Sequence, residues 1–201
     1  MQILIVDDGS QKQKAVDYII SEHLKSLNIS LYRINIDIFS NTVETNNVAF
    51  SYSDTDYLLR FDTDCFIDHE NLQTLLRLHD KYYAYVLNFK IDQETEFSES
   101  PHPSVFFLPK SIYQFYRFNE YFSGGYGFYD KDFTDLLIRK KRLKIVDAFF
   151  SIQNIQSITS VVDQQNLPMN FEKLLNPNRP FLVNVHREYY IPQILRSQIV
   201  V

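Results

Sequence analysis

Apolar and polar positions alternate along the chain in segments that predict strands and helices in turn. Short apolar runs between polar residues predict buried strands, at residues 2–6, 31–38, 57–61, 83–89, 104–108, 144–150 and 181–185. Apolar residues at helical spacing predict helices, at residues 11–27, 46–53, 71–82, 109–118 and 130–141. Residues 92–104 are polar and contain prolines, which is typical of a loop. This alternation indicates an α/β sheet that binds its ligands at the carboxyl ends of its strands.

Composition narrows the class of protein. The 201 residues are 45% hydrophobic, so we expect one domain with a sizeable core. A formal net charge of -5 gives no general attraction to phosphate backbones, and nucleic acid is not an expected partner. Cys65 is the single cysteine, no apolar run reaches the roughly 20 residues of a membrane span, and the start lacks a signal-peptide layout. We therefore expect a cytoplasmic protein without a transmembrane segment, and its oligomeric state stays open.

Glycine is scarce in this chain. Only 4 glycines occur, whereas average usage of about 7% would give about 14. Three of them cluster at Gly124, Gly125 and Gly127, and the fourth is Gly9. Because glycine serves where the backbone needs a positive φ or a close approach, both places are expected to have special backbone geometry.

Two acidic pairs follow predicted strands. Asp7 and Asp8 end the strand at residues 2–6, and Asp62 and Asp64 follow the strand at residues 57–61. Mg²⁺ and Mn²⁺ prefer oxygen ligands and are often shared between carboxylates and substrate phosphates. The position of the second pair at a strand end favours a metal site, although a solvated acidic loop gives the same letters.

Three segments carry a resemblance to a known family. LIVDDGS resembles the nucleotide-contacting strand of family-two GT-A glycosyltransferases, and DTDYLLRFDTDCFID resembles the segment with their metal-binding D-x-D. NEYFSGGYGFYDKDF is similar to the glycine-rich acceptor segment of galactosyltransferase-like members. The resemblance implies one GT-A-like domain over residues 1–201, with a mixed sheet flanked by helices. It also implies a nucleotide-sugar half at residues 1–90 and an acceptor and catalytic half at residues 104–201.

The resemblance implies a role for each matching residue. A divalent Mn²⁺ or Mg²⁺ ion on the donor diphosphate would take ligands from Asp62, Asp64 and His186. The donor and the sugars would be contacted by Asp7, Asp8, Arg60, Asp62, Gly125, Tyr126 and Gly127. Asp130 would be the catalytic base. The chain departs from the pattern where Tyr129 replaces a glutamate and where Met1 directly precedes the strand at residues 2–6. Because a strand and a helix usually come before this strand in the family, we expect either a trimmed GT-A core or a fragment of a longer protein.

The function implied by the resemblance is transfer of a sugar from a nucleotide donor, expected to be a UDP-sugar, to a glycan, lipid-linked or protein acceptor. Inversion at the anomeric carbon is favoured because Asp130 can act as a base. An inactive nucleotide-sugar-binding module of the same fold is the main alternative. A receiver domain would need a lysine followed by a proline on a late strand, and this sequence has no such pair. A haloacid-dehalogenase-type phosphatase would need threonine or valine where Phe66 stands.

Overall fold

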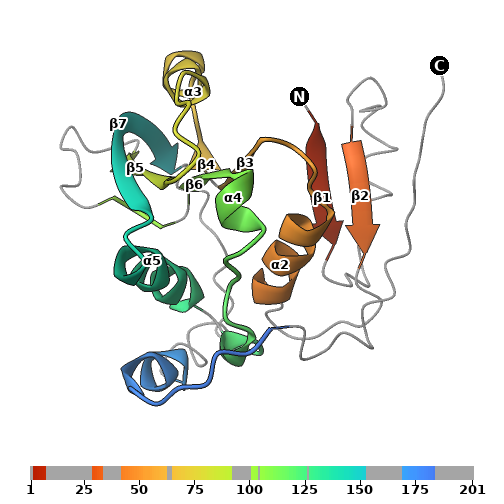
Figure 1. Ribbon diagram of the computed structural model, residues 1–201, viewed down its shortest axis with the longest axis vertical. Coiled ribbons are helices and arrows are strands. Elements are labelled where there is room, and N and C mark those ends of the chain that lie inside the picture. The colour runs from red at the N-terminus through yellow and green to blue at the C-terminus, as the bar shows by residue number, and fades with distance from the viewer. Residues whose placement is uncertain are drawn as a thin grey trace. The chain divides into compact units, whose positions relative to one another are not determined.

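The computed structural model of the chain describes residues 2–7, 29–33, 42–62, 65–91, 101–103, 105–125, 127–152 and 169–183 (Figure 1). The chain divides into two units, each assembled from separate stretches of sequence. Unit 1 combines Met1–Ser53, Phe118–Gly127 and Asn166–Val201, and unit 2 combines Asp54–Arg117 and Phe128–Gln165.

Unit 1 contains a parallel strand pair with a helix beside it. Strand β1 (Ile3–Asp7) pairs with β2 (Ile29–Arg33) in register from Ile3 opposite Ile29 to Asp7 opposite Arg33. Helix α2 (Thr42–Tyr52) contacts β1 (Figure 1). The 3₁₀ turn η2 (Glu120–Phe122) and a helical stretch at residues 169–175 complete its described elements. Its buried core is formed by apolar side chains of β2, α2 and η2 and by Phe118, which precedes η2; they include Leu31, Val43, Phe50, Phe118 and Phe122.

Unit 2 is built on a five-stranded mixed sheet in the order β3-β6-β5-β7-β4. Its strands are β3 (Tyr57–Phe61), β4 (Cys65–Phe66), β5 (Ala84–Ile91), β6 (Val105–Pro109) and β7 (Leu143–Ile152). Strands β5 and β7 are parallel, and the other neighbours are antiparallel. Strands β3, β5 and β7 therefore all run in one direction. We call the edge where these three strands end the carboxyl edge, and the edge where they start the amino edge.

Helices cover both faces of this sheet, which explains why every residue of β6 is buried. Val105 and Phe107 pack on one face with Leu75 of helix α3 (His69–Leu76). On the other face, Phe106 meets Phe133 of helix α5 (Tyr129–Arg139) edge to face, with ring centroids 5.4 Å apart.

The structure confirms the α/β class with a mixed sheet and the strand at residues 57–61. The helix expected at residues 109–118 is wrong in length, because helix α4 covers only Lys110–Tyr113. The backbone N–H and carbonyl of Phe118 are both bonded to the Asn47 side chain at 2.9 Å, which prevents the helix from continuing there. The helix expected at residues 11–27 lies outside the described residues.

The last expected strand, at residues 181–185, is not formed by the part that the structure describes, since residues 181–183 have no strand partner. The backbone of Leu182 instead bonds to the Asn119 side chain at 3.0 Å and to the Glu120 N–H at 2.8 Å.

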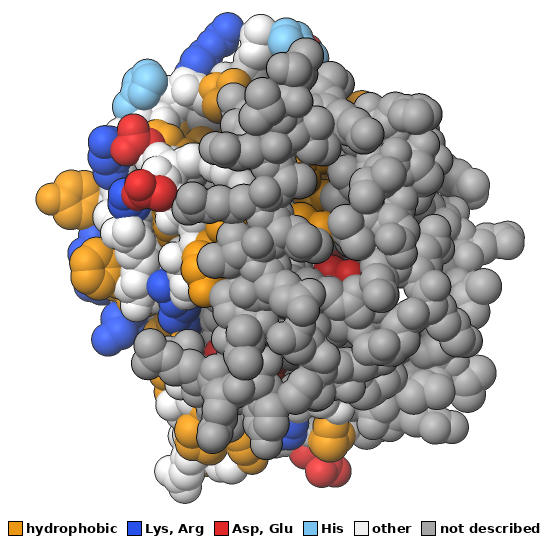
Figure 2. Space-filling view, turned by 90° about the vertical axis from the view of Figure 1, so that its right-hand side faces the viewer, with side chains coloured by type: hydrophobic (Ala, Val, Ile, Leu, Met, Phe, Trp, Pro, Cys, Tyr) orange, Lys and Arg blue, Asp and Glu red, His pale blue; other side chains and the backbone are white. Residues whose placement is uncertain are grey.

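No described helix is long and apolar enough to cross a membrane. Figure 2 shows hydrophobic, basic and acidic side chains interspersed along the left margin of the face in view.

Candidate active site

The carboxyl edge of unit 2 holds an arginine and an aspartate in a fixed pair. Arg60 is only 8% exposed, because alternation along β3 turns it inward while Phe61 faces out. Its Nη2 lies 2.8 Å from Oδ1 of Asp62, which follows the strand and is 33% exposed. The Arg60 Nη1 also donates to the carbonyl of Pro103 at 3.4 Å. The Asp62 carboxylate is thus held at the strand end and still reaches solvent.

The first turn of helix α5 brings a second carboxylate to the same place. Phe128 precedes the helix with φ of 65°, a left-handed conformation that is uncommon outside glycine. The helix then begins at Tyr129, so Asp130 is its second residue and does not occupy the N-cap position. Oδ1 of Asp130 accepts a hydrogen bond from the Lys131 N–H at 2.8 Å. Asp130 and Tyr129 interact electrostatically with both Arg60 and Asp62.

The surroundings of Asp130 favour its neutral form. Burial raises the pKa of this carboxyl above its usual range, and the negative charge of Asp62 raises it further. The Lys131 N–H, the Arg60 guanidinium and a positive charge on His102 oppose this shift without cancelling it. A carboxylate whose pKa is raised binds a proton more readily than an ordinary aspartate, as a general base requires.

Tyr129 lies near the charged groups of Arg60, Asp62 and Asp130. Burial raises the pKa of its phenol well above the usual value, and a hydrogen bond with Arg60 only partly opposes that. The phenol therefore keeps its proton at neutral pH and serves as a neutral hydrogen-bonding group. His102 lies near Asp130. The imidazole ring of His102 contacts the Phe150 ring edge to face, with ring centroids 6.3 Å apart. Neither side chain was assigned a role from the sequence, since only the folded chain shows that residues 102 and 129 approach β3.

The glycine-rich segment belongs to unit 1, and its geometry explains its composition. Gly124 and Gly127 have φ of 76° and 77°, which side chains rarely adopt. A Cβ added to Gly125 would lie 2.6 Å from Oδ1 of Asn170 and 2.7 Å from Cε of Met169. The chain therefore needs glycine at these three positions for backbone shape and close packing.

Buried polar side chains from distant parts of the sequence hold this segment. The Asn170 amide donates to the carbonyls of Phe122 at 3.2 Å and Gly127 at 3.0 Å, so it bridges the two ends of the glycine turn. The Ser123 hydroxyl donates to the Glu44 carboxylate. The sequence did not indicate Glu44 and Asn170, because their burial is visible only in the folded chain. A buried charge and a buried amide are unusual, and here they belong to a network of hydrogen bonds.

A model of the family described as glycosyl transferase family 2 matches residues 1–145. The chain belongs to glycosyl transferase family 2. Among solved structures, a mutant of Drosophila beta-1,4-galactosyltransferase 7, in complex with manganese, UDP-Gal and xylobiose, is similar at 13% identity and a TM-score of 0.44. That match covers 94% of this chain and 80% of the other. No curated protein matches the chain at a significant level.

Several residues expected to form the site of this glycosyltransferase are described, but they lie in different units. Arg60, Asp62 and Asp130 come together in unit 2. Asp7, buried at the end of β1, belongs to unit 1 together with Gly125 and Gly127. The remaining site residues lie outside the described part of the chain: Asp8, Asp64, Tyr126 and His186.

One described residue of the expected cation site, Asp62, has the chemistry of a metal ligand. No cluster of three or more histidine, cysteine or acidic side chains that could hold a metal occurs among the described residues. Asp62 is a partly exposed carboxylate at a strand end. Hard oxygen donors of this kind suit Mn²⁺ or Mg²⁺. Further ligands from Asp64 and His186 stay a prediction.

Proposed function

We propose that the protein transfers a sugar from a nucleotide-diphosphate donor, a UDP-sugar, to a hydroxyl of a glycan, lipid-linked or protein acceptor in the cytoplasm. Membership of glycosyl transferase family 2 supports the class of reaction. The observation that carries the site is the pairing of an arginine-held carboxylate, Asp62, with Asp130, whose pKa is raised. A carboxyl whose pKa is raised by burial, next to an ion pair, suits general acid–base chemistry.

Asp130 is the base in the proposed step. Its carboxylate takes the proton of the acceptor hydroxyl while the acceptor oxygen forms a bond to the anomeric carbon of the donor. The bond from that carbon to the diphosphate breaks, and the electron pair leaves on the diphosphate. Attack opposite the leaving group inverts the anomeric configuration. A positioned base of this kind contributes about 10²- to 10⁴-fold.

Charged residues of the proposed site bind the donor. Asp62, Asp64 and His186 are the proposed ligands of Mn²⁺ or Mg²⁺, and a bound cation would offset negative charge on the diphosphate. Arg60 places its positive charge next to Asp62, where it also suits donor phosphates. Tyr129 is held neutral and can hydrogen-bond to a sugar or phosphate oxygen.

The other matching residues complete the proposed site. Asp7 or Asp8 pairs with the base or ribose of the nucleotide. Gly125, Tyr126 and Gly127 contact the sugars. Both roles follow from the family motifs, and the structure describes the backbone at Asp7, Gly125 and Gly127.

A thermal-shift measurement tests donor and metal binding. A ligand at about 100 times its Kd stabilises a fold by roughly 2.7 kcal/mol, and at about 2 to 4 °C per kcal/mol this raises Tm by about 5 to 10 °C. We expect this shift with UDP and Mn²⁺, and little with UDP and EDTA. Equal shifts with and without Mn²⁺ would remove the metal from the proposal.

Two variants assign the metal ligands. Asp64→Asn removes a negative charge with little change in shape, so metal dependence and transfer should both collapse. His186→Ala should weaken Mn²⁺ binding, measured by titration calorimetry, while the fold persists. Donor binding by the wild-type chain without transfer to any acceptor would identify an inactive binding module.

A further inference from the structure

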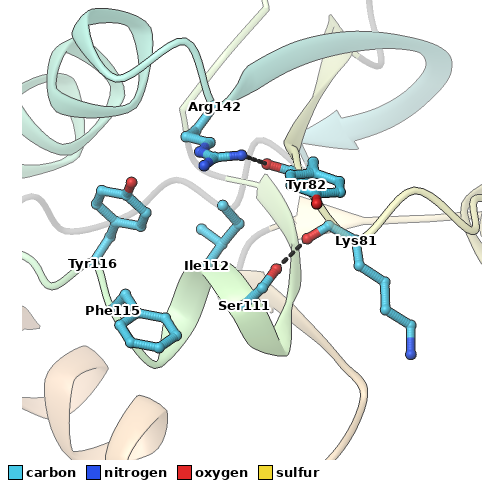
Figure 3. Close-up of a pocket in the computed structure, with 7 residues that line it drawn as sticks. All are labelled: Lys81, Tyr82, Ser111, Ile112, Phe115, Tyr116 and Arg142. Carbon is cyan, nitrogen blue, oxygen red and sulfur yellow. Dashed lines mark hydrogen bonds between the residues drawn. The ribbon is translucent and has the colours of Figure 1, made fainter.

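The amino edge of unit 2 carries an aromatic and basic surface that the proposed reaction does not use. A cavity of about 540 Å³ opens there, with Tyr82 and Arg142, which precede β5 and β7, on one side. Ile112 of α4, followed by Phe115 and Tyr116, forms the rest of the lining (Figure 3). We call the cavity and the charged residues around it the amino-edge surface.

Local contacts hold this surface in shape. The Ala84 N–H donates to the carbonyl of Arg142 at 2.7 Å, which joins the starts of β5 and β7. The Arg142 guanidinium lies 5.3 Å from the centre of the Tyr82 ring and donates to the Tyr82 carbonyl at 3.5 Å. The Ser111 hydroxyl donates to the Lys81 carbonyl (Figure 3). Hydrogen bonds thus tie together the residues before β5 and β7 and helix α4, which line the cavity.

Large aromatic side chains are exposed at this edge. Phe115 is 78% exposed and Tyr82 is 66% exposed, although the unit buries many other aromatic rings. Exposed aromatic rings beside a concave surface are typical of a place where another surface binds.

The charges around the cavity are predominantly positive, in a chain with a net charge of -5. Ion pairs join Lys110 to Asp54, Lys81 to Asp56 at 4.0 Å, and Lys144 to Asp80 at 3.2 Å. Lys140, Lys141 and Arg142 precede β7 and add positive charge that these three aspartates do not balance.

We propose that the amino-edge surface binds an anionic lipid membrane. Lys and Arg side chains are attracted to the negative surface of the cytoplasmic leaflet, and aromatic rings partition to the level of the lipid headgroups. Both groups lie together on the amino-edge surface, whereas the chain as a whole is repelled by negative surfaces. Strand β5 has eight residues, so roughly 25 Å separates the two sheet edges. Membrane binding would therefore leave Asp62 and Asp130 open to substrates.

Vesicle sedimentation of the full chain tests this proposal without any transfer assay, so it can fail separately from the proposed function. The wild-type chain should sediment with phosphatidylcholine vesicles that contain phosphatidylglycerol and stay in solution with phosphatidylcholine alone. Since each cation near such a surface adds about fivefold to the affinity, Lys140→Glu should weaken binding by roughly fivefold or more. Phe115→Ser should weaken it as well, and more salt should release the wild-type chain.

A matched control lies at the opposite end of the same helix. Lys131→Glu makes the same charge change as Lys140→Glu, but it lies in the first turn of α5, roughly 13 Å away along the helix. It should leave sedimentation within about twofold of wild type, since the proposed contact is local. Equal losses in both variants, or no binding of the wild-type chain to anionic vesicles, would overturn the proposal. It is also overturned if the wild-type chain is a dimer without lipid that Phe115→Ser dissociates, because the surface would then join two copies.

Discussion

Aspartate pKa values are shifted in opposite directions at the two edges of the sheet in unit 2. At the carboxyl edge, burial raises the pKa of Asp130. At the amino edge, Asp54 is exposed and its pKa is lowered by the hydrogen bond and charge of Lys110. The pKa of Asp80 is lowered there too, first by the Tyr82 N–H and also by Lys144. A recessed carboxyl suits proton transfer, whereas exposed, paired charges suit recognition of another surface.

Helix α5 connects the two edges and contributes to the difference. Its first turn carries Asp130 and Asp132, and its last turn carries Arg139. The helix dipole favours negative charge at the first turn and positive charge at the last. The acidic start of the helix therefore meets the strand ends near Asp62, and its basic end leads into Lys140 and Lys141.

The largest expected effect is loss of transfer in Asp130→Asn. The amide cannot accept the proton of the acceptor hydroxyl, so the transfer rate should fall by at least about 100-fold. Binding of UDP with Mn²⁺ should persist in the thermal-shift measurement. The control is Asp135→Asn on the same helix, whose partner is Lys131 at the surface, and it should transfer sugar at the wild-type rate. A wild-type rate in Asp130→Asn would place the base elsewhere.

The next effect concerns the arginine at each edge. Arg60→Met keeps much of the volume but removes the partner of Asp62, and loss of a hydrogen bond to a charged group costs about 1.5 to 3 kcal/mol. Arg142→Met at the amino edge should change the free energy of unfolding by no more than about 0.5 kcal/mol. Urea denaturation measures both. Equal losses in the two variants would show that the edges do not differ in the way described.

The pH dependence of stability should differ between the edges as well. Because the folded pKa of Asp130 is raised, the folded state binds more protons than the unfolded chain between the ordinary value of about 3.9 and the raised value. Wild-type stability should fall across that interval as pH rises, and Asp130→Asn should lack this fall. Transfer should change in the opposite direction, because a base must be deprotonated: it should fall as pH drops through the raised pKa of Asp130, at a higher pH than for an ordinary aspartate. Parallel stability curves for the two chains would contradict the raised pKa.

The smallest effect is expected for Asp80→Asn. The lowered pKa of Asp80 contributes stability above its unfolded pKa, which is lost as pH falls through the folded pKa. The variant should therefore be slightly less stable than wild type at neutral pH and equal to it in strong acid. Its transfer rate should not change, since Asp80 lies at the edge away from Asp130. A large loss of transfer would show that the amino edge takes part in the reaction.

Local sequence patterns predicted the elements that position the candidate site. The run YLLRF at residues 57–61 is apolar between polar flanks, and it is a strand whose end presents Asp62. The helix expected at residues 130–141 begins one residue earlier, which leaves Asp130 in its first turn as expected. Both predictions depended on periodicity within a few residues.

The errors arose where distant side chains bond to the backbone. The Asn47 side chain bonds to the N–H and carbonyl of Phe118, 71 residues away, so the expected helix cannot include that residue. The Asn119 side chain and the Glu120 N–H bond to Leu182, and residues 181–183, the described part of the expected strand, have no strand partner. Side chains of this type compete with regular structure, and neither partner is visible in a local window. The contact of Tyr129 with Arg60 could not be predicted for the same reason.

The bridge that Asn170 makes across the glycine turn has a consequence for shortened forms of the protein. The family match ends at residue 145, yet the Phe122 and Gly127 carbonyls take their hydrogen bonds from residue 170. A chain cut at the end of the matched region would keep every residue of the glycine segment but lose the Asn170 amide that bridges its two ends. Those two carbonyls would then lose their bonds to Asn170, whereas the hydrogen bond from Ser123 to Glu44 would still restrain the turn. The boundary suggested by sequence similarity therefore falls inside a folded unit. A chain trimmed to that boundary would contain the glycine-rich segment without the residue that joins its two ends.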